Sequence, residues 1–134
     1  MSRALLPADK RCDALRALVS KDDVCKVALY GSKILPESLL NGYTTEGEAS
    51  GQGYVAGGQT LEGFVCGKDP SGSWFSWSKN PIWPVSTIKG IRYALIYNTS
   101  KGNQAVSVTD FNEEKSSRNG PFTVYLPHKV ITLR

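Results

Sequence analysis

Apolar and polar residues alternate with the spacing of β-strands over most of the chain beyond residue 23. Each alternating run is short and is bounded by residues typical of turns, mainly Gly, Pro, Asn, Asp and Ser. Strands are predicted at 24–30, 59–66, 73–77, 88–97, 105–111, 122–126 and 129–133. Many short strands at hairpin spacing favour a mainly β fold, an antiparallel β-sandwich or barrel.

Helical periodicity is confined to the N-terminal part of the chain. Residues 5–19 place apolar side chains at intervals of three and four, which forms one stripe along a helix. We therefore predict a single domain, 1–134, with one N-terminal α-helix at 5–19 and a β-sandwich at 24–134. A short helical turn is also expected at 36–40.

Two segments are predicted to be connections between strands. Residues 80–84 contain two prolines, each of which fixes φ and biases the preceding residue toward extended geometry, so a rigid connector is expected. Residues 113–120 are polar and lack alternation, so they are predicted to form a loop.

The most distinctive stretch is the glycine segment, residues 47–58, which contains five glycines in twelve residues. Glycine reaches positive φ without steric cost, so this backbone can turn sharply or approach another chain closely. The spacing matches neither GxGxxG nor GxxxxGK[ST], and no helix is expected after it, which argues against a phosphate-binding loop.

Composition limits the possible functions. The chain has 134 residues, a net charge of +4 and no basic run, so a nucleic-acid interface is not predicted. No apolar run approaches the roughly 20 residues of a membrane span, and no signal peptide is evident at the N-terminus, so we expect assembly in a cytoplasm. The three cysteines are expected to be reduced thiols that pack in the core.

Catalytic chemistry has little support. The only histidine, His128, lies between Pro127 and Lys129, and no nucleophile motif is present. We predict no enzyme activity, no catalytic residue, no cofactor and no metal site. Glu46 and Glu48 would share a face in an extended segment, and they are kept as a candidate for calcium or for basic groups of a partner.

Aromatic residues gather at 74–83, where Trp74, Phe75, Trp77 and Trp83 lie within ten residues. An exposed tryptophan row would bind sugars by stacking. Alternation between the two faces of a strand would instead bury some of the rings, and tryptophan is also enriched at subunit interfaces. We favour a core role combined with an interface role.

The order of these motifs resembles small virion proteins of tailed bacteriophages. Their pattern is a KVALY strand, a YTTxGE turn, a GxGYxAGGxxL loop, a WPxSTI segment, an RxAxIYN strand, a VxDF strand and an NGxFTVxxP hairpin. The corresponding residues here are 26–30, 43–48, 51–61, 83–88, 92–98, 108–111 and 119–127.

The resemblance implies a structural protein of the virion, most simply a decoration or cement protein that binds the major capsid protein. It implies partners among virion proteins and self-association in many copies, with no direct nucleic-acid or membrane contact. A tail, neck or fibre-attachment component is an alternative, and a carbohydrate-binding module is an alternative of another class. The residues expected to contact a partner are Tyr43, Glu46, Glu48, Gly53, Tyr54, Gly57, Gly58, Trp74, Trp77 and Trp83.

Overall fold

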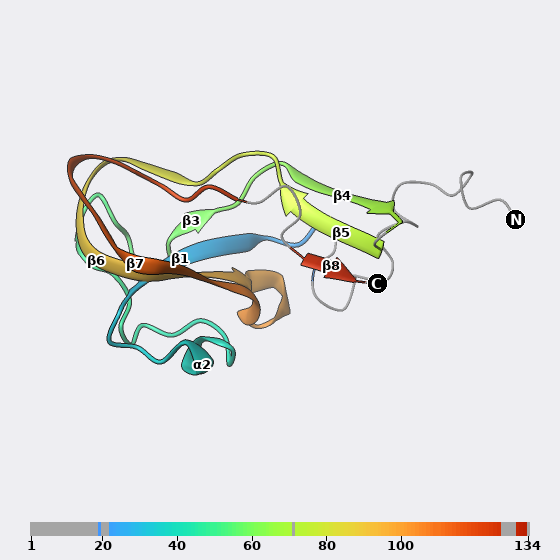
Figure 1. The fold of residues 1–134 in the computed structure, drawn as a ribbon, viewed down its shortest axis with the longest axis horizontal. Helices are drawn as coiled ribbons and strands as arrows, with labels where there is room; N and C mark the ends of the chain where they lie inside the picture. Colours follow the sequence, from blue (N-terminus) through green and yellow to red (C-terminus); the bar gives the residue numbers. More distant parts are fainter. Residues whose placement is uncertain (1–18, 20–21, 71, 127–130, 134) are drawn as a thin grey trace, which may run out of the picture.

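The computed structural model describes residues 19, 22–70, 72–126 and 131–133, and its fold is mainly β with antiparallel pairing throughout (Figure 1). The elements are β1 (Cys25–Gly31), α2 (Pro36–Leu39), β2 (Gly51–Gln52), β3 (Gln59–Thr60), β4 (Phe64–Asp69), β5 (Gly72–Trp77), β6 (Ile82–Asn98), the 3-10 turn η3 (Thr99–Lys101), β7 (Gln104–Thr123) and β8 (Ile131–Leu133). The predicted mainly β, antiparallel class is confirmed. The helix expected at 5–19 lies outside the described residues, apart from Val19.

The larger sheet is built around β6. Strand β7 runs along one side of β6, from the pair Asn98↔Gln104 to the pair Ile82↔Thr123. On the other side of β6, β1 pairs with its C-terminal half and β2 with its N-terminal half, and β3 adds to β1. The smaller sheet has the order β4-β5-β8.

The β6–β7 hairpin is long enough to bend back over its own sheet. Figure 1 shows both strands curving together and returning above β1 and β3 toward β4 and β5. The main core fills the space that this bend encloses, where Trp83 and Phe122 of the returning half pack in one cluster with Val27, Ala94 and Ile96 of the sheet. This layered arrangement fits the predicted sandwich.

A second cluster covers the opposite face of the larger sheet. The segment around α2 lies on this face (Figure 1) and contributes Ile34 and Leu39. They pack with residues of β1 and β6, among them Tyr30 and Tyr97. Strand β1 is therefore buried on both faces, which explains why residues 27–30 are almost continuously apolar.

The two predicted connections at 80–84 and 113–120 are wrong, because both segments lie largely within long strands. Strand β6 begins at Ile82 and accommodates Pro84 where the register shifts between Trp83 and Ser86. Residues 113–120 belong to β7, where most side chains are exposed, so pairing with β6 does not require apolar alternation.

The cysteines only partly follow expectation. Cys25 is a free, buried thiol, and burial raises its pKa to about 12. Cys66 is disulfide-bonded, so the prediction that it is a reduced thiol is wrong. Cys12 lies outside the described residues.

Candidate contact surface around the glycine segment

The glycine segment is tied to the sheet at both ends. Gly51 pairs with Ile88 through β2, and Gln59 pairs with Val27 through β3. Residues 53–58 therefore connect β2, which pairs with β6, to β3, which pairs with β1 (Figure 1). The segment follows the sheet closely and does not project from it as a free loop.

The carboxylate of Glu48 holds the segment from within. The hydroxyl of Tyr43 donates to Oε1 of Glu48 at 2.6 Å, and the hydroxyl of Tyr54 donates to Oε2 at 2.6 Å. The backbone N–H of Gly57 donates to the same Oε2 at 2.8 Å. The hydroxyl of Tyr54 also accepts the N–H of Leu29, at 3.1 Å, which links the network to β1. The Glu48 carboxylate therefore bonds Tyr43, which precedes the glycine segment, and Tyr54 and Gly57 within it.

Two further tyrosines complete this network, and sequence reasoning did not identify them. The hydroxyl of Tyr97 donates to the carbonyl of Gly57 at 2.6 Å, and its ring stacks on that of Tyr43 with centroids 4.8 Å apart. The hydroxyl of Tyr30 donates to the carbonyl of Thr44 at 2.6 Å. Both residues lie near the ends of predicted strands. The sequence feature that could have identified them is a hydroxyl-bearing side chain within an otherwise apolar run.

The environment keeps these hydroxyls protonated. Burial raises the pKa of Tyr30 to about 12 and that of Tyr97 to about 12. Burial also raises the pKa of Tyr43 and of Tyr54, and the hydrogen bond from each to the Glu48 carboxylate raises it further. The four side chains are therefore neutral hydrogen-bond donors at ordinary pH, and the network suits holding the backbone in place.

Gly57 and Gly58 occupy positions where the backbone is left-handed and contacts are close. Their φ angles are +98° and +82°. A Cβ on Gly58 would overlap the carbonyl oxygen of Val27, which is backbone and cannot move away. A Cβ on Gly57 would instead lie 3.2 Å from Nζ of Lys26 and 3.5 Å from the hydroxyl of Tyr97. The glycine signal is thus explained here by packing against the protein's own sheet.

Part of the outer side of the segment is apolar and exposed, although Ser50 and Gln52 are exposed there too. Val55 is 74% exposed, and Gly53 and Ala56 are exposed beside it in sequence. Gly53 packs against the backbone of Val85 and Ser86, and Val85 is itself 63% exposed. We call the surface formed by Gly53, Val55, Ala56 and Val85 the glycine-segment surface. Of the residues predicted to contact a partner, Gly53 and Glu46 are exposed, and Tyr43, Glu48, Gly58 and Trp74 are half-buried.

The tryptophans lie mostly inside the protein. Trp83 is 1% exposed and Trp77 is 5% exposed, and the ring of Tyr54 stacks on Trp83 with centroids 5.8 Å apart. Trp74 is half-buried, with its ring close to Gly67. The exposed tryptophan row that sugar stacking requires is therefore absent from the described residues.

The paired carboxylates predicted at Glu46 and Glu48 have different environments. Glu48 is half-buried in the tyrosine network, whereas Glu46 is exposed. Among the described residues, no group of three or more His, Cys, Asp and Glu side chains is placed to hold a metal ion. A hollow of about 320 Å³ lies beside Glu48 and is lined also by Lys89 and Ile91. His128 lies outside the described residues.

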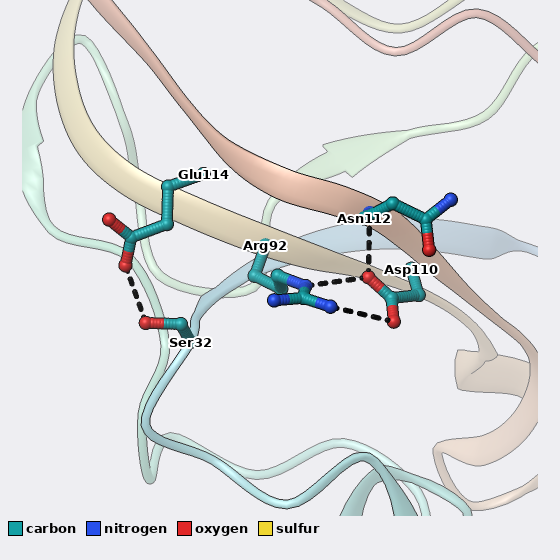
Figure 2. Close-up of polar contacts among 5 residues, drawn as sticks. All are labelled: Ser32, Arg92, Asp110, Asn112 and Glu114. Carbon is teal, nitrogen blue, oxygen red and sulfur yellow. Dashed lines mark hydrogen bonds and ion pairs between the residues drawn. The ribbon is translucent and has the colours of Figure 1, made fainter.

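A charged stretch of the β6–β7 hairpin contrasts with this apolar surface. Figure 2 shows Arg92 of β6 reaching Asp110 of β7, where Nε donates to Oδ1 at 2.8 Å. The N–H of Asn112 donates to the same oxygen at 2.7 Å, and Ser32 donates to Glu114 nearby. The Arg92 guanidinium and the Asn112 N–H lower the pKa of Asp110, so this carboxyl stays ionised.

The comparisons with known proteins add no relative. No family model, no curated protein and no solved structure matches the chain. No helix among the residues that the structure describes is long and apolar enough to cross a membrane.

Proposed function

We propose that this chain is a non-enzymatic structural protein of a tailed-bacteriophage virion, and that it decorates the head by binding the major capsid protein. The order of sequence motifs at 26–30, 43–48, 51–61 and 83–127 supports this context, because it resembles small phage virion proteins. The proposal places the protein in the virion after assembly in the host cytoplasm.

The observation that carries the proposal is the glycine-segment surface. Val55 presents an apolar side chain to solvent on a segment that hydrogen bonds to Glu48 hold at Tyr54 and Gly57, and Val85 is exposed on β6, where its backbone lies against Gly53. A surface that is already ordered loses little conformational entropy when a partner binds it. An apolar surface also gains free energy by leaving water, at about 25 cal/mol per Å² buried.

Copy number would strengthen a modest contact. A decoration protein is arrayed on a repeating lattice, and contacts among arrayed copies raise the effective affinity of each one. The proposed contact residues are the exposed residues of this surface, namely Gly53, Val55, Ala56 and Val85, together with Glu46, which is exposed just before the segment in sequence. Tyr54 stacks on Trp83 inside the fold, and Trp77 is buried in the same core cluster.

A binding experiment with particles that lack this protein tests the proposal. Val55→Asp places a charge at the centre of the glycine-segment surface, and we expect at least about tenfold weaker binding with an unchanged melting temperature. Val65→Asp is the matched control, since Val65 is 41% exposed on β4 of the other sheet. It should bind like the wild type.

The outcomes separate the alternatives. Equal binding of Val55→Asp and wild-type protein would remove the glycine-segment surface from the interface. Binding of the wild type only to isolated tails or necks would transfer the same surface to a tail or neck role. Failure to bind heads, tails and necks would contradict a virion role.

A further inference from the structure

Cys66 of β4 is disulfide-bonded, and the other cysteines of the chain identify its partner. The chain contains three cysteines, Cys12, Cys25 and Cys66. Cys25 is a free thiol, which excludes it as the partner. Within one copy of the chain, Cys12 is the cysteine that remains. We propose that Cys12 and Cys66 form a disulfide that fastens the N-terminal segment, residues 1–18, to β4.

Val19 gives independent support for this pairing. It is 1% exposed and belongs to the main core cluster, and Cys66 packs against the same cluster. The N-terminal segment therefore joins the described fold at the core that Cys66 borders. Residues 12 and 19 are seven positions apart, a length of about 10 Å in a helix and up to roughly 25 Å in an extended chain. A connection of this length allows residue 12 to lie beside the same core.

The apolar stripe predicted at 5–19 agrees with the pairing. Cys12 and Val19 are both members of this stripe, and residues seven positions apart lie on the same face of a helix. A helix over these residues would therefore direct Cys12 toward the core that buries Val19. The face that carries the cysteine is the face that already has a known contact in the fold.

The environments of the two described cysteines explain why Cys66 is the one that reacts. Cys25 is 1% exposed, whereas Cys66 is half-buried. Burial raises the pKa of the Cys25 thiol to about 12, so Cys25 forms very little of the thiolate that attacks a disulfide. Cys25 therefore stays out of the exchange, and Cys66 pairs with Cys12.

The bond forms by thiol–disulfide exchange with an oxidised low-molecular-weight disulfide such as oxidised glutathione. The thiolate of one cysteine attacks a sulfur of glutathione disulfide and releases one glutathione thiolate, which leaves a mixed disulfide on the protein. The thiolate of the other cysteine then attacks the protein sulfur and releases the second glutathione. One protein disulfide forms, one glutathione disulfide is reduced, and the two protein thiol protons end on two glutathione thiols.

The disulfide would distinguish the newly made protein from the protein in oxidising surroundings. Disulfides are rare in a reducing cytoplasm and persist outside it, including on the surfaces of virions. A bond between residues 12 and 66 closes a long loop, and such a bond stabilises a fold mainly by constraining the unfolded chain. It would therefore fasten the N-terminal segment after the protein leaves the cytoplasm. The inference rests on the cysteines alone and is independent of the proposed function.

Peptide mapping of the full-length wild-type protein tests the pairing directly. The reduced protein is treated with oxidised glutathione, alkylated with N-ethylmaleimide as it is denatured, and digested with trypsin without reduction. Trypsin should separate the three cysteines into peptides 12–16, 22–26 and 34–68. We expect mass spectrometry to find 12–16 linked to 34–68, with 22–26 alkylated. Prior treatment with dithiothreitol should leave all three peptides unlinked and alkylated.

Thermal melting then tests the effect of the bond on stability. Dithiothreitol should lower the melting temperature of the oxidised wild type by about 5–15 °C. Cys12→Ala and Cys66→Ala should each lose this response to the reductant. Cys25→Ala is the matched control, because it removes the free thiol. The response should persist in this variant, even if the change in the core lowers its melting temperature in both conditions.

Four results would each overturn the proposal. Peptide 34–68 could be recovered alkylated from the oxidised wild type, or linked to 22–26. It could also be linked to the same peptide of a second copy, which a dimer on a non-reducing gel would reveal. A response to dithiothreitol that survives in Cys12→Ala would equally contradict the pairing. None of these results depends on capsid binding, so the proposed function is tested separately.

Discussion

The glycine segment at 47–58 and the aromatic segment at 74–83 were both expected to contact a partner, yet the structure uses them differently. The aromatic segment points most of its rings inward, where Trp77 and Trp83 are buried in the main core. The glycine segment lies on the outside and leaves Val55 exposed. Of these two segments, the one with the largest side chains contributes mainly to the core, and the one with the smallest lies on the outside of the protein.

The two segments also depend on each other. Tyr54 of the glycine segment stacks on Trp83, and its hydroxyl reaches Glu48 at 2.6 Å. The core therefore positions the network, and the network positions the surface. Variants of the two segments should separate these roles. A change in the core should lower the stability of the whole fold, whereas a change at the surface should weaken only the binding of a partner.

The largest effect is expected for Trp83→Ala. The side chain is 1% exposed, and large-to-small changes of a buried tryptophan cost about 3–5 kcal/mol. Denaturant unfolding should show this loss. Trp74→Ala is the comparison within the same segment, and because Trp74 is only half-buried its cost should be clearly smaller. Equal losses of stability in Trp83→Ala and Trp74→Ala would contradict the division of this segment into a buried core part and a half-buried periphery.

The next effect distinguishes two neighbouring glycines. Gly58→Ala adds a Cβ against the backbone carbonyl of Val27 at positive φ, and we expect a cost on the order of 3 kcal/mol. Gly57→Ala meets only the end of the Lys26 side chain and the Tyr97 hydroxyl, at ordinary or slightly short distances, so about 1 kcal/mol is expected. Chemical denaturation of both variants measures the difference. The reverse order would show that the segment is not packed on β1 as described.

Glu48→Gln tests the network itself. The amide replaces one carboxylate oxygen by an N–H donor, so at least one of the hydrogen bonds donated by Tyr43, Tyr54 and Gly57 loses its acceptor. This loss should lower the free energy of unfolding by about 1–3 kcal/mol. The neutral amide oxygen is also a weaker acceptor than a carboxylate, so amide hydrogen exchange should accelerate at Gly57. Glu46→Gln is the matched control and should change stability by less than about 0.5 kcal/mol, since Glu46 is exposed. Similar exchange in both variants would show that Glu48 does not hold the segment.

The smallest effect at neutral pH is expected from ionisation of the tyrosines, because their hydroxyls lose protons only in alkaline solution. The pKa of Tyr30 and that of Tyr97 are each raised to about 12 in the folded protein, from about 10 in the unfolded chain. A raised pKa contributes stability that is complete below pH 10 and is lost as pH rises through about 12. Ultraviolet absorbance of tyrosinate should therefore rise together with unfolding between these values. Full ionisation of all six tyrosines near pH 10 in the folded protein would contradict the buried network.

Sequence reasoning succeeded where local pattern determines structure. The strand at 24–30 and the turn at 36–40 are present as β1 and α2, because continuous apolar character and Pro36 act locally. It failed at 80–84 and 113–120, where pairing with a distant strand overrides a local signal of proline or polarity. Tyr43, Glu48, Tyr54 and Gly57 were predicted to contact a partner, whereas the structure joins them to one another in the Glu48 network.

Its remaining members depended on tertiary structure. Tyr97 is 40 residues from Gly57, and only the sheet brings them together. The same limit applies to the roles of the aromatic segment, because alternation indicates that some rings are buried without identifying which ones. Burial of Trp77 and Trp83 follows from the bend of the β6–β7 hairpin and from β5, and neither arrangement can be inferred from the aromatic segment alone.

The most direct test of the account is cryo-electron microscopy of the native particle at a resolution that shows side chains. The account predicts many copies of this chain on the head lattice, with Val55 and Val85 facing the major capsid protein and Trp83 buried within the chain. Density for the chain on the head with the glycine segment facing solvent would contradict the proposed contact. Absence of the chain from the particle would contradict the structural role itself.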